Sequence, residues 1–120
     1  QNLSILVIDN EKSIQTGMAS LLGGWGCQVV TAASLDEAIA QYPSGVPDII
    51  LADYHLSENQ TGDYAIAALL AHFQRSVPAI MISADRGEAL KAKMAALAIP
   101  LLSKPVKPAQ LRALLRTILR

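Results

Sequence analysis

The sequence predicts an α/β fold, a doubly wound five-stranded parallel sheet with helices on both faces. Five short apolar runs, most with little polar alternation, are typical of strands buried on both faces of a parallel sheet. They cover residues 3–8, 28–31, 48–52, 79–82 and 100–102. A segment of helical period follows each run. At 120 residues and 52% hydrophobic composition, the chain fits one domain with one sheet and leaves no room for a second domain.

The helical segments carry apolar residues three or four positions apart, so each presents one apolar face to the sheet. In chain order these residues are Ile14, Met18, Leu21 and Leu22; Leu35, Ala38 and Ile39; Ile66, Leu69, Leu70 and Phe73; Leu90, Met94 and Leu97; Leu111, Leu114, Leu115 and Ile118. The regular strand and helix alternation predicts right-handed crossovers, and it places a ligand crevice beyond the carboxyl ends of the strands.

Several helix ends are marked by residue type. Capping-box spacing joins Ser34 to Glu37 and Asp85 to Glu88, and Pro108 suits the first turn of the last helix. The glycines of the GGWG stretch at 23–26 follow a helix and precede a strand, so they are predicted to end that helix.

Composition excludes several classes of protein. Ten basic and ten acidic residues balance, which argues against a nucleic-acid or membrane surface of one charge. No apolar run approaches the roughly 20 residues of a membrane span. Cys27 is the only cysteine, so no internal disulfide forms, and we expect it to be a small buried hydrophobe in a reducing, cytoplasmic setting. Gln1 at the start and Arg120 just past a helix predict a single domain, 1–120, cut from a longer chain.

Polar residues lie where four of the predicted strands end. Asp9 and Asn10 follow the first strand, Asp53 the third, Ser83 the fourth and Lys104 the fifth. A single acid after a strand is often only a helix cap, but the set converges on one sheet edge. Carboxylates attract a hard cation such as Mg²⁺, and a hydroxyl and an ammonium bind oxyanions. The pattern indicates a phosphoryl-transfer pocket.

Four motifs, VIDNE, IILADYHL, MISAD and LSKPVKP, occur in an order and spacing that resemble the receiver domain of two-component response regulators. The resemblance covers essentially the whole chain. It implies a flavodoxin-like (βα)5 fold with strand order 2-1-3-4-5. It further implies that Asp53 is the phosphoacceptor, and that Asp9, Asn10, Asp53 and the backbone carbonyl of His55 hold Mg²⁺.

The same resemblance implies that Ser83 is the hydroxyl that turns toward an acyl phosphate and that Lys104 pairs with that phosphate. The Lys104–Pro105 peptide bond is expected to be cis. The only reactions expected are self-phosphorylation from a donor and slow self-dephosphorylation. The side chain of His55 is expected to be a partly exposed loop group, and His72 a surface or boundary residue.

Two positions depart from the usual receiver pattern. Asn10 replaces the second of two acids, so we expect weaker Mg²⁺ binding, partly offset by Glu11, and less repulsion among the acids. The alternative is that Asn10 is mainly a helix cap in a pocket that no longer takes phosphate. Leu101 stands where many receivers carry a Tyr or Phe that swings inward, so output is expected to depend on the Ser83 loop and the fourth helix, or on passing phosphate onward.

The stretches LLGGWGCQVVTAAS, LADYHL and KPVKPAQLRALL look like the C-terminal receiver of hybrid sensor histidine kinases. That setting implies a histidine kinase in cis or in trans as the donor, and a histidine phosphotransfer domain as a possible acceptor. It also implies a cytoplasmic location, alone or as the cytoplasmic part of a membrane-bound sensor. No nucleic acid or direct membrane contact is expected, and the oligomeric state stays open.

Three other functions compete with this interpretation. A pseudo-receiver would keep the fold as a phosphorylation-independent interaction module, with Asn10 as its best argument. A nucleotide- or flavin-binding domain rests only on GGWG, which lies after a helix instead of opening one. Hydrolysis with Ser83 as nucleophile lacks the flanking glycines of a nucleophile elbow and an evident histidine base.

Overall fold

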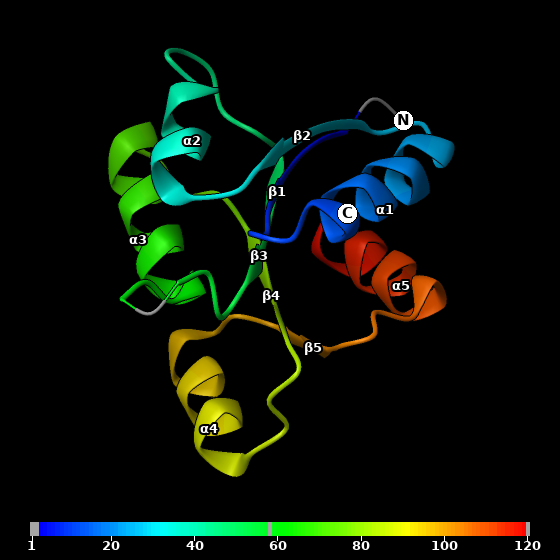
Figure 1. The fold of residues 1–120 in the computed structure, drawn as a ribbon, viewed down its shortest axis with the longest axis vertical. Helices are drawn as coiled ribbons and strands as arrows, with labels where there is room; N and C mark the ends of the chain where they lie inside the picture. Colours follow the sequence, from blue (N-terminus) through cyan, green and yellow to red (C-terminus); the bar gives the residue numbers. More distant parts are fainter. Residues whose placement is uncertain (1–2, 58, 120) are drawn as a thin grey trace.

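The structure is a computed structural model that describes residues 3–57 and 59–119. Gln1 and Arg120, on which the expectation of a longer chain rests, lie outside the described residues. Five parallel strands form one sheet in the order β2-β1-β3-β4-β5, which confirms the predicted fold (Figure 1). The strands are β1 Ser4–Ile8, β2 Gln28–Ala32, β3 Ile49–Asp53, β4 Ala79–Ser83 and β5 Leu101–Ser103.

Five helices connect and cover the strands. They are α1 Lys12–Gly24, α2 Leu35–Ala40, α3 Gly62–Phe73, α4 Glu88–Leu97 and α5 Pro108–Ile118. Figure 1 shows α1 and α5 on one side of the sheet and α2 and α3 on the other. In the part of the chain that the structure describes, no helix is long and apolar enough to cross a membrane.

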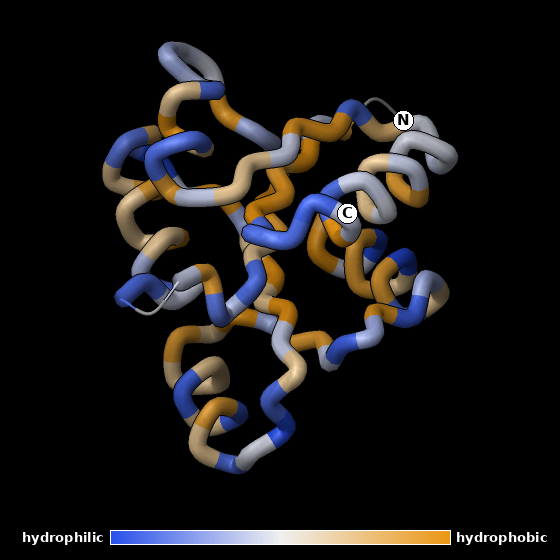
Figure 2. The backbone as a smooth tube through the Cα atoms, in the orientation of Figure 1, coloured by the Kyte–Doolittle hydropathy of each residue, from blue (hydrophilic) through white to orange (hydrophobic). Residues whose placement is uncertain are grey.

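Strand residues alternate between two apolar cores, one on each face of the sheet. Leu6 and Ile8 of β1 pack into the core under α2, α3 and α4, whereas Ile5 and Val7 pack under α1 and α5. Figure 2 shows these hydrophobic strands at the centre of the molecule. The central strands are buried on both faces and therefore read as continuous apolar runs. The edge strands β2 and β5 are only half-buried over most of their length.

Parallel pairing brings the strand ends together at one edge. Ile8 pairs with Ala52, Asp53 with Ile82, and Ser83 with Ser103, so the residues after β1, β3, β4 and β5 meet in space. Four strands, β2 to β5, end one residue later than predicted. As a result, Asp53 and Ser83 are the last residues of β3 and β4 instead of the first residues after them.

The helix-end predictions had mixed outcomes. Pro108 begins α5, and α1 ends at Gly24 within the GGWG stretch, both as predicted. Ser34 caps α2 by accepting the Glu37 N–H, but the Glu37 carboxylate accepts from Ala33 N–H, one residue before the cap. The capping box predicted for Asp85 is wrong. Helix α4 is capped by Gly87, and the Asp85 carboxylate instead accepts the Gly87 N–H at 2.8 Å.

Candidate functional site

One lysine ammonium joins the acidic groups at the carboxyl edge of the sheet. Lys104 follows β5, and its Nζ lies 3.2 Å from Asp53 Oδ2 and 3.6 Å from Asp9 Oδ2. Glu11 Oε1 is also near, at 3.9 Å. Both aspartates are almost fully buried, with 3% and 6% of Asp9 and Asp53 exposed. The structure therefore brings Asp9, Asp53 and Lys104 into one pocket, as the strand ends predicted.

Ser83 is fully buried at the end of β4 beside this pocket. Its Oγ accepts the backbone N–H of Asp85 at 3.0 Å, and its carbonyl accepts the N–H of Lys104 at 2.9 Å. Since the hydroxyl is engaged as an acceptor, its own proton is available to donate to an anion. The Lys104–Pro105 bond is cis, as expected.

Asp9 is held by Glu11, the residue before α1, and by Gln15 of α1. Asp9 Oδ1 accepts the N–H of Glu11 at 2.9 Å, and the buried amide of Gln15 donates to the Asp9 carbonyl at 2.6 Å. Burial, the largest influence, raises the pKa of the Asp9 carboxyl, and Asp53 adds to the increase. The Glu11 N–H and Lys104 oppose this change without cancelling it. Asp9 is thus a destabilised carboxylate that gains from any added positive charge.

The charged form of Lys104, unlike that of Asp9, is favoured by its surroundings. Burial lowers the pKa of the Lys104 ammonium, but attraction to Asp53, the hydrogen bond to Asp53, and attraction to Asp9 together outweigh burial and raise that pKa. The group therefore stays charged at neutral pH. It supplies a fixed positive charge next to Asp53.

Residues that could hold a divalent cation include Asp9 and Asp53. The part of the chain described contains no group of three or more His, Cys, Asp or Glu side chains arranged to hold a metal. The oxygen-only pair nevertheless fits Mg²⁺, which is commonly bound through one or two carboxylates and keeps several waters. The Lys104 ammonium lies within 3.6 Å of both carboxylates, so a positive charge at this position is shared between them. His55 follows on the adjacent loop, where its N–H donates to Asp53 Oδ1 at 3.3 Å.

Asn10 is exposed, and among the described residues its side chain makes no hydrogen bond to the carboxylate of Asp9 or Asp53. Its Nδ2 donates to the Leu56 carbonyl at 2.9 Å. The alternative that Asn10 caps α1 is wrong, because Glu11 is the N-cap residue and no side chain caps that helix.

A cavity of about 450 Å³ extends from the carboxylates beneath α1. Asp9, Asp53 and Lys104 form its polar end, and apolar side chains such as Met18 and Val106 line the rest. The apolar wall keeps water away from one side of the carboxylates, which strengthens electrostatic interactions in the pocket.

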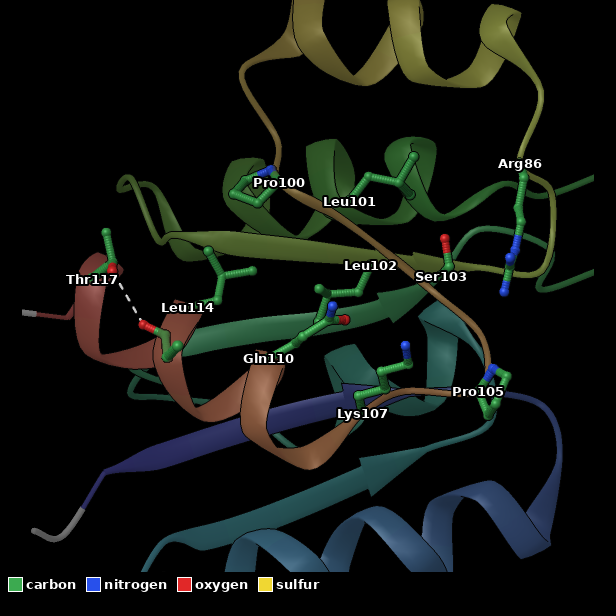
Figure 3. Close-up of a pocket in the computed structure, with 11 residues that line it drawn as sticks. Arg86, Pro100, Leu101, Leu102, Ser103, Pro105, Lys107, Gln110, Leu114 and Thr117 are labelled. Atoms are coloured by element: carbon green, nitrogen blue, oxygen red, sulfur yellow. Dashed lines mark hydrogen bonds between the residues drawn. The ribbon is translucent and has the colours of Figure 1, made fainter.

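Leu101 lies outside the pocket, at the start of β5. It is half-buried, packs against the core under α4, and lines a hollow of about 730 Å³ between β5 and α5. Figure 3 shows Leu101, Pro105 and Leu114 around this hollow. An inward-swinging aromatic ring is therefore absent from this position.

The histidines and the cysteine lie apart from the pocket chemistry. The side chain of His55 is exposed and stacks edge-on to Tyr54 at 4.9 Å. His72 is exposed, and its Nε2 lies 2.8 Å from the Tyr42 carbonyl. Cys27 is only half-buried, against the core of α1 and α5, so it is less enclosed than predicted.

Two features near the site were missed from the sequence. Gln15 lies on the buried face of α1 together with Met18 and Leu22, and a polar residue at such a core-facing position is the signal that would have found it. The second is Lys93 of α4, whose Nζ donates to Tyr54 Oη at 2.8 Å and pairs with Asp63 at 3.2 Å. No local pattern marks that contact.

Together these features define a doubly wound α/β domain with an acidic pocket and one lysine at the carboxyl ends of its strands. The model of the response regulator receiver domain matches residues 5–116. The chain belongs to this family, whose members act in two-component signal transduction.

Similar proteins agree with this assignment. Protein PilG of Pseudomonas aeruginosa is 33% identical over 93 residues, which are 76% of this chain and 67% of PilG. The transcriptional regulatory protein ZraR of Escherichia coli is 39% identical over 57 residues, only 13% of ZraR. The chemotaxis protein CheY4 of Vibrio cholerae shares the fold, with a TM-score of 0.83 over 98% of both chains at 24% identity. A two-component response regulator from Clostridium difficile has a TM-score of 0.86 at 22% identity, covering 100% of this chain and 97% of that chain.

Proposed function

We propose that this receiver domain accepts a phosphoryl group on Asp53 in a Mg²⁺-dependent reaction. The observation that carries the proposal is the Lys104 ammonium placed 3.2 Å from Asp53 and 3.6 Å from Asp9 in a buried pocket. Such a group neutralises charge on a phosphoryl group that arrives between it and the carboxylates. The donor is the phosphohistidine of a histidine kinase, in cis or in trans.

In the proposed step an Asp53 oxygen forms a bond to phosphorus as the bond from phosphorus to the donor nitrogen breaks. The His55 N–H and Lys104 hold the two Asp53 oxygens from different sides, which orients the carboxylate for in-line attack. Lys104 then pairs with a phosphoryl oxygen. The Ser83 hydroxyl turns its proton toward another oxygen, drawing the loop after β4 inward.

Asp9, Asp53 and the His55 carbonyl are the groups proposed to hold Mg²⁺, which when bound adds positive charge beside the phosphoryl oxygens. Asn10 is the weakest member of the set proposed from the sequence, because its amide is engaged elsewhere. We therefore expect weaker metal binding than in a receiver with three acids.

The proposal extends to the protein around the domain. We place residues 1–120 as one receiver domain of a longer chain, a hybrid sensor histidine kinase, with a histidine phosphotransfer domain as the next acceptor. A single cysteine that forms no internal disulfide fits the reducing cytoplasm. The domain has no independent catalytic activity beyond its own phosphorylation and dephosphorylation.

One observation favours the second candidate, a pseudo-receiver that binds partners without phosphorylation. The Asn10 amide bonds to Leu56, so the position that usually supplies an acid does not add to the charge of the pocket. The buried Asp53 and Ser83, with the Lys104 ammonium 3.2 Å from Asp53, weigh against this candidate.

The test is intact-protein mass after incubation with acetyl phosphate, with and without Mg²⁺. The natural sequence is expected to gain one phosphoryl group only with Mg²⁺, and Asp53→Asn is expected to gain none. Asp36→Asn, the same chemical change at an exposed site on α2, serves as the matched control and keeps full labelling. No gain in the natural sequence would favour the pseudo-receiver, and undiminished labelling of Asp53→Asn would refute the acceptor assignment.

A further inference from the structure

Asn10 joins two loops that are distant in the sequence. Its Nδ2 donates to the Leu56 carbonyl across 46 residues, at 2.9 Å. Asn10 belongs to the turn between β1 and α1, and Leu56 to the segment between β3 and α3 that begins just after Asp53. These two segments flank the carboxylate pair. Leu56 is anchored, because only 3% of it is exposed and its side chain packs in the core.

At its start the segment after β3 is held by β4 and α4, because the Tyr54 N–H donates to the Ile82 carbonyl at 2.9 Å and Lys93 donates to Tyr54 Oη at 2.8 Å. The other hydrogen bonds of the segment run within it and to the start of α3. The Gly62 N–H donates to the Tyr54 carbonyl at 2.8 Å, His55 forms an isolated bridge with Thr61, and the Ser57 N–H donates to Gln60 at 3.2 Å. Among the residues described, the amide of Asn10 makes the sole hydrogen bond from the turn after β1 to this segment.

Only a donor can make this contact. An ionised carboxylate at position 10 would present acceptor oxygens to the carbonyl oxygen of Leu56, and two acceptors repel each other. An acid there would need a cation between itself and the other segment. The neutral amide needs no cation. The replacement of acid by amide therefore changes the hydrogen bonds around the pocket as well as its charge.

We infer that Asn10 is a positioning residue that holds the two loops of the pocket together before any metal binds, and that it is not a metal ligand. The peptide it holds begins at the carbonyl of Leu56, directly after His55. The inference rests on the proposed function, because His55 and Asp53 matter as metal groups only if that function holds. It assigns Asn10 a role different from the ligand role expected from the sequence.

The test reads the peptide group itself. The Leu56 carbonyl and the Ser57 N–H belong to one peptide unit, and that N–H donates to the Gln60 carbonyl. Releasing the peptide unit from Asn10 is expected to open this bond more often, so hydrogen exchange of the Ser57 amide reports the contact to Asn10 indirectly. We would measure exchange by NMR in EDTA for the natural sequence, Asn10→Ala, Asn10→Asp and the control Lys12→Ala. Lys12 is the first residue of α1, and its side chain is exposed. The affinity for Mg²⁺ alone would be measured by titration for each.

Both Asn10 variants are expected to exchange roughly three- to tenfold faster at Ser57 in EDTA, the range that one neutral hydrogen bond supplies. Lys12→Ala is expected to match the natural sequence, and the amide of Leu51 in β3 checks that every variant is folded. The Mg²⁺ affinity of Asn10→Ala is expected to fall, but by no more than the exchange rate rises, because the metal then also has to order the loop. Asn10→Asp is expected to bind Mg²⁺ more tightly than Asn10→Ala.

Two results would overturn the inference. Unchanged exchange with weaker Mg²⁺ binding in Asn10→Ala would make Asn10 a ligand. Faster exchange with unchanged Mg²⁺ affinity would make the contact structural only. The exchange measurement uses no metal and no phosphodonor, so a failure of Asp53 to become labelled would refute the proposed function and leave the Ser57 result standing.

Discussion

Gly62, the first residue of α3, leaves no room for a side chain next to the acceptor strand. A Cβ added there would lie 2.6 Å from the carbonyl oxygen of Asp53, 2.6 Å from Met81 Sδ and 3.1 Å from Tyr54 Cα. The sulfur ends a flexible side chain and can move. The Asp53 oxygen belongs to a central strand and cannot, so Gly62→Ala has to displace the start of α3 or the end of β3.

The expected cost follows from these contacts. Overpacking a well-filled site costs about 1–3 kcal/mol. Replacing a glycine in the middle of a helix returns roughly 0.5–1 kcal/mol, and less of this gain applies to Gly62 because it is the first residue of α3. Gly62→Ala is therefore expected to lower the free energy of unfolding by about 1–2 kcal/mol. Gly17→Ala is the matched control, because a Cβ at this exposed position of α1 meets nothing within 4 Å. It is expected to raise the free energy of unfolding by roughly 0.5–1 kcal/mol.

Urea unfolding followed by far-UV circular dichroism measures both variants against the natural sequence. The same substitution is expected to shift the midpoint in opposite directions at the two sites. Displacement at Gly62 also moves the Asp53 carbonyl, so labelling by acetyl phosphate is expected to slow in Gly62→Ala and not in Gly17→Ala. A Gly62→Ala protein as stable as the natural sequence would refute the claim that α3 and β3 are in rigid contact here.

Two further predictions concern charge. The pKa of Asp9 is raised by burial and by Asp53, so ionising Asp9 costs stability as the pH rises above the ordinary carboxyl value of 3.8. Asp9→Asn is expected to have a higher free energy of unfolding than the natural sequence at pH 7, and this difference is expected to shrink toward pH 3.5. No difference between the two proteins at either pH would contradict this. Lys93→Met removes the contacts to Tyr54 and Asp63, so amide exchange in α4 is expected to rise with little change in global stability. Lys91→Met, which loses only an exposed pair with Glu88, is the control, and an equal rise in both variants would argue against a link through Lys93.

The sequence was sufficient for the groups that follow strands. In a parallel sheet the carboxyl ends meet at one edge, so locating five strands also locates Asp53, Ser83 and Lys104 near one another. Errors of one residue in strand length did not alter this result, because each group stays at the same edge. The alternation of strand residues between the two faces of the sheet and the end of α1 were also predictable, because each depends on the local spacing of residues along the chain.

Contacts that depend on tertiary distance were not predictable. Asn10 and Leu56 are 46 residues apart, and nothing in either segment marks the other as its partner. Asp85 shows a different limit. An aspartate before a helix can cap it or bond to the N–H two residues on, and the local sequence allows both. Here the Asp85 N–H bonds to Ser83, which places the residue in the second arrangement and leaves Gly87 as the cap.

The position of Trp25 determines what the protein's intrinsic fluorescence reports. This only tryptophan follows the last turn of α1, where its ring packs against the core of α1 and α5 and lies 5.3 Å from the guanidinium of Arg112. Helix α1 begins beside the acidic pocket, and a helix of this length spans about 20 Å. The indole emission is thus an optical probe of how α1 and α5 are held together, and it is remote from events at Asp53.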